Sequence, residues 1–433
     1  MKYLILIVII PCLLWYKSNN DNNNIMSTYF AETDNFVKVK GTRFYRAGTR
    51  YMIKGANYWQ GINLATLDGG DRDRLNLELD QLLKVGVNNI RLMAGSEGPD
   101  DQPYRMRPSL QTEPNQYNEV VFQGLDYLLD AIGRRNMTAV MTLSNFWHWS
   151  GGFAQYIAWI THEPIPYPVT RDKWDAFTDF TRRFYLDETI KRQVNSLYKQ
   201  HIRTVQNRKN TVNGKIYNED PTIMSWQIAN EPQLAPAEWF NDISRYIKQG
   251  APQQLVSAGI ESKVDQIDFL NAHDPDTIDY CTCHLWVENW GEYDPSDATT
   301  LKNAQQYGHD FIQSRSDWTS EIKKPIVLEE FGMARDAWRR PQDSAYKYAP
   351  STPTSHKDIY FKGLFDQIEQ LDSYGGSNFW AYGGLGRSTD DPNEYNMTWL
   401  GDPPHEPKGW YSVYDNDTTL GIIKQHFTNV QTK

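Results

Sequence analysis

The sequence IMSWQIANEPQ, at residues 223–233, begins as a buried strand and ends in a carboxylate at Glu231. An amide, Asn230, precedes this carboxylate, and Pro232 follows it. A buried carboxylate costs free energy unless it is paired with another group or used in chemistry. The residues elsewhere in the chain decide which of these explanations holds.

Seven other short apolar runs are similar to this one, and amphipathic helical stretches such as residues 72–86, 119–135 and 189–205 lie between them. This alternation indicates βα units around a parallel sheet. Eight strands predict an α/β fold of the (β/α)8 TIM-barrel class. A doubly wound sheet also alternates, but it usually has fewer strands, and no Gly-rich phosphate loop follows the first strand. We expect the strands at residues 52–57, 88–93, 138–143, 223–228, 255–258, 278–284, 326–330 and 377–380.

Composition excludes several classes of protein. The net charge of −10 argues against nucleic acid, whose binding proteins carry clustered Lys and Arg. Cysteine and histidine do not have the spacing of a zinc site, so we predict no metal and no cofactor in the chemistry. Cys281 and Cys283 are too close for an ordinary disulfide, and they alternate away from His284, so we expect inert packing. The 15 Trp and 26 Tyr suggest flat surfaces for stacking a ligand.

A barrel collects its catalytic residues at the carboxyl ends of its strands. Polar and aromatic residues follow the carboxyl ends of most of the expected strands. Each one alone is more often packing or a salt bridge, and their recurrence at one rim is the evidence for a site. They are Arg91, Asn145, Trp147, Asn230, Glu231, His284, Trp286, Glu330 and Trp380.

Two carboxylates stand out at this rim, Glu231 and the glutamate pair in VLEEFG. Two carboxylates on either side of a glycosidic bond are the usual apparatus for its hydrolysis. The alternative for each is a buried ion pair with arginine. Strand alternation groups Glu231 with Ser225 and Gln227, but it cannot choose between Glu329 and Glu330, which should point to opposite sides.

The motifs IANEPQ and VLEEFG resemble those of glycoside hydrolase family 5, a family of (β/α)8 barrels. Among its members the sequence is most similar to the endo-β-1,4-mannanases, and the similarity runs from about residue 36 to the C-terminus. The stretches that carry it are GANYWQG at 55–61, GVNNIRLM at 86–93, LSNFWHWSGGFAQY at 143–156, DYCTCHLWVENWG at 279–291 and GDPPHEPKGWYSVYD at 401–415.

The resemblance implies a role for each rim residue. Glu231 would be the acid/base, and Glu330 the nucleophile, because the family nucleophile directly precedes an aromatic-Gly pair, here Phe331 and Gly332. The remaining residues would bind substrate or hold these two. Asn230 would bind the sugar 2-hydroxyl, Arg91 would keep Glu330 ionised, and His284 would lie beside the acid/base. Trp380 would form the floor of the sugar site, and Trp286 replaces the Tyr of many members. The residues that would line subsites, unless the tryptophans belong to the core, are Asn145, Trp59, Trp147, Trp149 and Trp290.

The activity implied is that of a retaining endo-β-1,4-mannanase that cleaves internal bonds of mannan, galactomannan and glucomannan. Retention requires carboxyl groups roughly 5–5.5 Å apart. The pKa of Glu231 should lie above that of Glu330, since the acid must hold its proton. The alternatives are a cellulase or other β-1,4-glucanase of the same family and a non-catalytic polysaccharide-binding barrel. We expect a monomer whose partner is a β-mannan polysaccharide or oligosaccharide.

The N-terminal segment is expected to direct export. Residues 3–15 form an apolar run of signal-peptide length, and an Asn-rich stretch follows it. Residues 1–26 are therefore predicted to be a signal peptide, or a lipoprotein anchor through Cys12. Such an anchor would be the only membrane tether. The protein is expected to be secreted or surface-anchored, in the extracellular space or the periplasm. Residues 27–433 should form one catalytic barrel domain. It should begin with a small β-hairpin or lid, and its long βα loops should include one at 334–355 over the site.

Overall fold

The computed structural model describes residues 35–431, except residues 103, 169–173, 338–351 and 388–399. The predicted signal peptide or anchor at residues 1–26 lies outside the described residues, as does most of the loop predicted at 334–355. Within the described part of the chain, no helix is long and apolar enough to cross a membrane.

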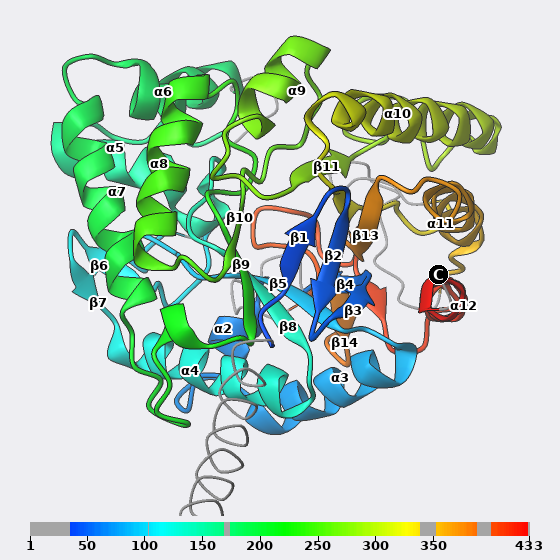
Figure 1. Ribbon diagram of the computed structural model, residues 1–433, viewed down its shortest axis with the longest axis horizontal. Helices are drawn as coiled ribbons and strands as arrows, with labels where there is room; N and C mark the ends of the chain where they lie inside the picture. The colour runs from blue at the N-terminus through cyan, green and yellow to red at the C-terminus, as the bar shows by residue number, and fades with distance from the viewer. Residues whose placement is uncertain (1–34, 103, 169–173, 338–351, 388–399, 432–433) are drawn as a thin grey trace, which may run out of the picture.

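Eight parallel strands form a barrel, with the order β10-β9-β8-β5-β4-β13-β12-β11. A bridge between Ser257 and Tyr280 joins the first and last strands of this order, which closes the ring. The predicted α/β barrel and its eight strands are thus confirmed (Figure 1). The strands are β4 (Ile53–Asn57), β5 (Asn89–Met93), β8 (Thr138–Thr142), β9 (Ile223–Gln227), β10 (Leu255–Ser257), β11 (Cys281–Leu285), β12 (Ile326–Phe331) and β13 (Tyr374–Phe379).

Helices surround the barrel, as Figure 1 shows. The first long helix has the start and stop that its sequence predicts: the Asp71 side chain accepts the amide of Arg74, and Gly86 ends the helix in the left-handed region, with φ 101°. The helices predicted at 72–86, 119–135 and 189–205 are present. Among the described residues the α-helices are α2 (Gly61–Leu64), α3 (Arg72–Val85), α4 (Glu119–Arg134), α5 (Gly152–Thr161), α6 (Trp174–Leu186), α7 (Lys191–Gln206), α8 (Ala237–Gly250), α9 (Gln266–His273), α10 (Leu301–Ile322), α11 (Ser355–Ile368) and α12 (Thr419–Gln431).

The N-terminal β segment is a three-stranded antiparallel sheet of β1 (Lys38–Lys40), β2 (Arg43–Arg46) and β3 (Thr49–Tyr51), one strand more than a hairpin. Phe44 of β2 is fully buried and packs edge-on against Tyr280, with 5.3 Å between the ring centroids. The same cluster includes Ile53, Met224, Leu255 and Val327, which stand early in the barrel strands. The sheet therefore covers the amino end of the barrel, opposite the rim where the site residues were expected.

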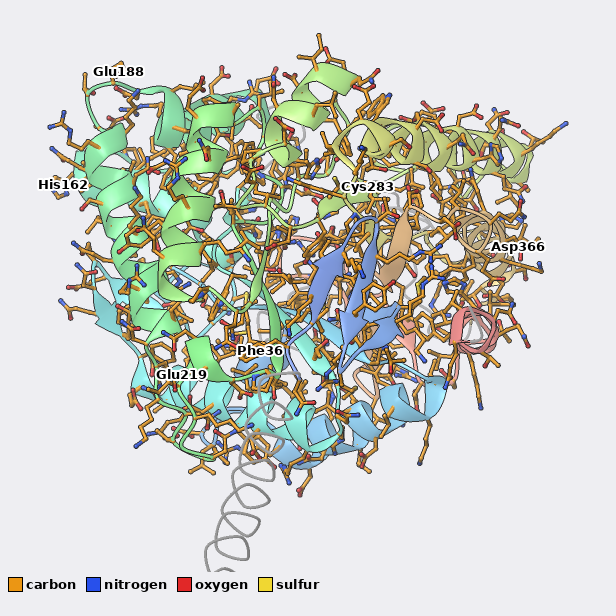
Figure 2. The ribbon with its side chains drawn as sticks, in the orientation of Figure 1. Phe36, His162, Glu188, Glu219, Cys283 and Asp366 are labelled. Carbon is orange, nitrogen blue, oxygen red and sulfur yellow. The ribbon has the colours of Figure 1, made fainter. Side chains whose placement is uncertain are left out.

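The carboxyl end of the barrel carries the longer connections. Two small sheets, β6 (Gln111–Glu113) with β7 (Gln116–Tyr117) and β14 (Tyr382–Gly384) with β15 (Val413–Tyr414), lie within them. Figure 2 places Cys283 inside the molecule and Glu188 and Asp366 at its edge. Cys281 and Cys283 are buried free thiols, and burial raises the pKa of Cys283 to about 12, which agrees with inert packing.

Candidate active site

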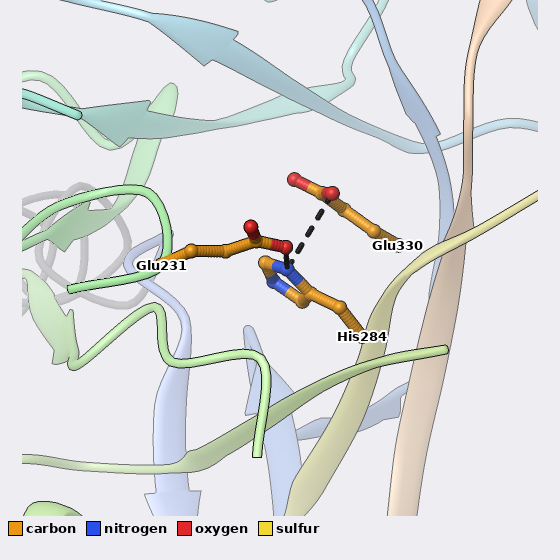
Figure 3. A group of neighbouring side chains, drawn as sticks. All are labelled: Glu231, His284 and Glu330. Carbon is orange, nitrogen blue, oxygen red and sulfur yellow. Dashed lines mark hydrogen bonds and ion pairs between the residues drawn. The ribbon is translucent and has the colours of Figure 1, made fainter. Parts of the chain in front are cut away.

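Glu231 and Glu330 reach the same point from two different strands. Glu231 follows β9 and has a left-handed backbone, with φ 51°, and its amide donates to the carbonyl of Gly259 at 2.8 Å. Gly259 permits this approach, because a Cβ there would lie 1.9 Å from the carbonyl oxygen of Ala229. Glu330 stands in β12, and each carboxylate places one oxygen within 4.8 Å of the other and of a His284 nitrogen (Figure 3).

Arg91 of β5 forms an ion pair with Glu330. Its Nη1 donates to Oε1 of Glu330 and, at 2.9 Å, to Oδ1 of Asn57. Its Nη2 donates to Oδ1 of Asn230 at 2.7 Å, and its Nε donates to Oε1 of Gln227 at 2.9 Å. The guanidinium therefore fixes the nucleophile candidate and the amide beside the acid/base candidate with one rigid group.

His284 of β11 lies between the two carboxylates. Its Nδ1 is 2.6 Å from Oε1 of Glu231 and 3.4 Å from Oε2 of Glu330, and the ring is fully buried. Burial lowers the pKa of His284, but the charge of Glu330 and the contacts with Glu231 and Glu329 outweigh burial and raise the pKa to about 10. The imidazole is therefore protonated at neutral pH.

The two catalytic candidates differ in their electrostatics. Burial works to raise the pKa of Glu231, but the hydrogen bond and charge of His284 outweigh it, so the pKa lies below its ordinary value. Burial also raises the pKa of Glu330, and His284 and Arg91 offset only part of this effect. The expected order, with the pKa of Glu231 above that of Glu330, is reversed in this structure because the short bond from His284 goes to Glu231.

Residues of the loop after β8 also orient Glu231 and Asn230. Trp147 was expected to be a stacking platform, but its indole Nε1 donates to Oε2 of Glu231 at 2.5 Å. Asn145 accepts from the Trp147 amide at 3.0 Å and from Nδ2 of Asn230 at 3.1 Å. The loop after β8 thus orients both the carboxylate and the neighbouring amide.

Three of the predicted tryptophans meet in one aromatic cluster. Trp149 lies edge-on to Trp59, with 5.8 Å between ring centroids, and to Trp380, with 6.3 Å. The ring of Trp149 is also parallel to that of His405, with 6.3 Å between the ring centroids. His405 also contacts His148, at 5.2 Å. Since the indole of Trp59 donates to the carbonyl of Gly401 at 2.9 Å, two loops meet across this side of the site.

The residues on either side of Glu231 line two different cavities. The cavity on the Asn230 side has a volume of about 10 Å³ and is bounded by Arg91, Trp59, Trp149 and Trp380, among others, while the cavity on the Pro232 side has a volume of about 210 Å³. The smaller space holds about one water molecule. A sugar ring can enter it only if the aromatic walls move apart.

The remaining two tryptophans lie elsewhere. Trp286 packs against Trp380 and Tyr411, with 5.9 and 4.9 Å between ring centroids, and among the described residues no hydrogen bond joins it to Glu330. Trp290 packs on Tyr307 and Phe311 and is not part of the aromatic cluster. The structure thus brings Trp286 to the floor of the site but leaves Trp290 outside it.

Sequence reasoning missed three polar residues of the site. Asn57 accepts from Arg91, Gln227 accepts from Arg91 as well, and Glu329 accepts from Nε2 of Gln227 at 2.7 Å. Asn57 ends the first strand of the barrel, so the same rim argument could have found it. Glu329 was expected to face away from Glu330. Both reach the centre because the β11–β12 pairing shifts by one residue between Cys283 and His284.

A metal ion is not needed to explain this geometry. Glu231, His284 and Glu330 have atoms close enough to bind one. However, Nδ1 of the protonated His284 faces Glu231, and the Arg91 guanidinium binds Glu330, so each group has a counter-charge.

Comparison with known proteins shows the family of this chain. The model of the GH family 5 beta-mannosidase-like family matches residues 34–433. A crystal structure of a glycoside hydrolase family 5 mannosidase from Rhizomucor miehei is 63% identical, with a TM-score of 0.90, and the match covers 92% of this chain and 98% of that one. Two further structures of that enzyme carry glutamate-to-alanine substitutions at positions 99 residues apart, and one of them is a complex with mannosyl-fructose.

More distant proteins share the fold. Mannan endo-1,4-beta-mannosidase 1 of Arabidopsis thaliana is 26% identical over 395 residues, which is 85% of each chain. The endo-1,4-beta-mannanase of Rhizomucor miehei is 19% identical, with a TM-score of 0.67 over 92% of this chain and all of that one, which shows the barrel alone. On the match over residues 34–433, the chain belongs to the beta-mannosidase-like group of glycoside hydrolase family 5.

Proposed function

We propose that this protein is a retaining β-mannosidase that releases mannose from the ends of mannooligosaccharides. Glu330 attacks the anomeric carbon while Glu231 protonates the departing oxygen, and Glu231 then activates the water that hydrolyses the glycosyl-enzyme. The observation that best supports a retaining mechanism is that one oxygen of Glu231 lies within 4.8 Å of one oxygen of Glu330. Retaining pairs stand roughly 5–5.5 Å apart and inverting pairs roughly 6.5–9.5 Å apart.

The proton for the acid step is held by His284 and Glu231 together. His284 is protonated at neutral pH, and 2.6 Å separates its Nδ1 from Oε1 of Glu231. Nδ1 of His284 passes its proton to Glu231 as Glu231 protonates the leaving oxygen, which leaves a Glu231 carboxylate beside a neutral imidazole. That carboxylate can then accept the proton of the attacking water. The low pKa of Glu231 is therefore compatible with general acid catalysis, because the pair carries the proton.

The Rhizomucor miehei enzyme supports the choice of these two glutamates. Its two glutamate-to-alanine substitutions lie 99 residues apart. Glu231 and Glu330 have the same separation in this chain. At 63% identity, we infer that the two pairs occupy the same positions and that a mannosyl group is the unit this site accepts.

The aromatic cluster favours action at a chain end. Trp149 stacked on His405, with Trp59 bound to Gly401, forms a wall beside the small cavity. An enzyme that cleaves internal bonds needs an open groove on both sides of the bond. One sugar enters behind this wall only when the aromatic side chains move apart, and three buried polar atoms without a hydrogen-bond partner among the described residues are then available to bind it: Trp380 Nε1, His148 Nδ1 and Asn145 Nδ2.

The second candidate is the endo-β-1,4-mannanase activity that the sequence predicts. Its support is the plant relatives, which are named mannan endo-1,4-beta-mannosidases and are 24–28% identical. A wall that moves with substrate would make such activity possible, on mannan, galactomannan or glucomannan.

The product pattern from mannohexaose separates the two activities. A β-mannosidase gives mannose and mannopentaose first, whereas an endo-mannanase gives mannobiose, mannotriose and mannotetraose. Early products followed by NMR should show the β-anomer, and an α-anomer would overturn the retaining mechanism. Carboxymethylcellulose is the control substrate, and its hydrolysis at a similar rate would favour the glucanase alternative.

We also propose that the protein is exported, because residues 3–15 have the length and composition of a signal-peptide core. Mass spectrometry of protein from the native culture tests this proposal. A mature N-terminus beyond residue 15 in the medium or at the cell surface is expected, and intact protein confined to the cytosol would contradict export.

A further inference from the structure

A third buried carboxylate, Glu329, precedes Glu330 directly in β12. Its Oε2 is 3.5 Å from Nε2 of His284, the ring nitrogen opposite to the one that faces Glu231. Among the described residues Nε2 of His284 has no hydrogen-bond partner, so the ion pair with Glu329 is the contact that it makes. The side chains of Glu329 and His284 are 1% and 0% exposed, so water cannot substitute for this contact.

The neighbours of Glu329 fix it as an acceptor. Oε1 of Gln227 accepts from Nε of Arg91 at 2.9 Å. Because a guanidinium can only donate, the amide has a single orientation, and its Nε2 must donate to Oε2 of Glu329, at 2.7 Å. The Nε of Arg91 is itself 3.9 Å from the same oxygen. The carboxylate is thus held, by donors on two other strands, against the far side of the His284 ring.

We propose that Glu329 is a positioning residue that acts through His284, keeping both ring nitrogens protonated so that Nδ1 can serve Glu231 as a proton reserve. The arrangement is a row of carboxylate, imidazolium and carboxylate: Glu329 at Nε2, and Glu231 at Nδ1. This inference rests on the proposed function, since it assigns the supply of the proton that the acid step consumes. The proton that leaves Nδ1 goes through Glu231 to the leaving oxygen, and the water that hydrolyses the glycosyl-enzyme returns one proton to the pair through Glu231.

Other charged groups also face His284 and must be weighed with Glu329. Glu330 of β12 lies 3.4 Å from Nδ1, and Glu261, after β10, interacts with both His284 and Glu231. Arg91 of β5 is the opposing cation. Among these groups Glu329 alone contacts Nε2. Its replacement therefore changes the surroundings of Nε2 and not the contact between Nδ1 and Glu231.

The test is Glu329→Gln, which keeps the shape and removes the charge. On mannobiose, whose leaving group needs protonation, the alkaline limb of the kcat/KM profile should move down by at least one pH unit, a tenfold loss above the limb. On 2,4-dinitrophenyl β-mannoside, whose leaving group needs almost none, the loss should stay within threefold. An unmoved limb, or equal losses on both substrates at every pH, would overturn the proposal.

A matched control and a second readout separate this role from a structural one. Asp126→Asn also removes a buried carboxylate paired with arginine, on helix α4, and should leave the limb in place. NMR of 15N-histidine protein, with His284 assigned through His284→Asn, should show His284 losing its proton at least one pH unit lower in Glu329→Gln. If the wild type hydrolyses no β-mannoside, the proposed function fails, and this titration still decides the present inference. If Glu329→Gln does not fold, Glu329→Asp replaces it: a limb and titration identical to wild type would contradict the proposal, and a smaller downward shift would support it.

Discussion

Arg91 and Glu330 form a buried ion pair that joins β5 to β12 across the barrel, with exposed fractions of only 4% and 3%. The same guanidinium reaches Asn230, the residue before Glu231. The position of the nucleophile candidate and that of the acid/base candidate therefore depend on one side chain. The ion pair connects stability with catalysis, because each change to it leaves a buried charge without its partner.

Arg91→Lys tests this dependence. Lysine keeps the charge but loses the planar fork, so at least two of the four donated bonds are lost. We expect kcat/KM on mannobiose to fall at least about 100-fold, since hydrogen bonds to charged groups contribute about 1.5–3 kcal/mol each. Steady-state kinetics measures this loss. Arg208→Lys, at a forked ion pair on the outer helices, is the control and should lower the melting temperature alone.

Glu330→Ala should abolish turnover while leaving the barrel folded. Loss of the nucleophile is expected to cost on the order of 10³-fold or more in kcat. Sodium azide should restore part of the rate and give the α-mannosyl azide, because the small anion attacks from the face that the carboxylate occupied. NMR of the product identifies the anomer. Formation of the β-mannosyl azide would instead assign the acid/base role to Glu330.

The barrel and the residues at its rim could be predicted because they depend on local pattern, whereas the choice of Glu330 over Glu329 came from the family resemblance. Each strand carries its own apolar run, and the rim residues follow the strand ends, so the sequence contains Glu231, Glu330 and Arg91 in recognisable places. The start of β13 was missed because Gly375 and Gly376 weaken a strand pattern, although both lie within Tyr374–Phe379.

Long-range contacts could not be predicted in the same way. Strand alternation predicts that Glu329 faces away from Glu330, and only the register shift beside His284 brings both inward. Trp149 and His405 are far apart in sequence, and their stacking follows from the path of two loops. Trp147 and Trp290 have equal claims as platforms in the sequence, yet one binds Glu231 and the other packs on α10.

Glu97 predicts a specific dependence of stability on pH. Burial raises its pKa from 4.5 to about 7, against the opposing hydrogen bonds from Gly152 and Ser144. Its pKa in the folded state is thus above that in the unfolded state, so its contribution to stability is fully present below about pH 4.5 and is lost as the pH rises to about 7. The difference of about 2.5 pH units corresponds to about 3 kcal/mol at most.

Glu97→Gln removes this titration. The free energy of unfolding of the variant minus that of wild type should therefore be larger at pH 8 than at pH 5. Urea unfolding of both proteins at the two pH values measures this difference. Buried histidines such as His148 and His273, whose pKa values burial lowers to about 3, remain in both proteins and cancel in the comparison. An equal difference in stability at both pH values would show that Glu97 titrates normally in the folded protein.

His405→Ala tests the wall that favours action at a chain end. The ring of His405 stacks on Trp149 and contacts His148, so its removal should open the far side of the small cavity. We expect the variant to release mannobiose and mannotriose from mannohexaose early in the reaction, with a several-fold lower KM for mannohexaose and little change for 4-nitrophenyl β-mannoside. High-performance anion-exchange chromatography measures the products. His309→Ala, at an exposed histidine of α10, is the control. If the His405 variant still released only mannose and mannopentaose at first, the preference for chain ends would have to arise from residues other than this ring.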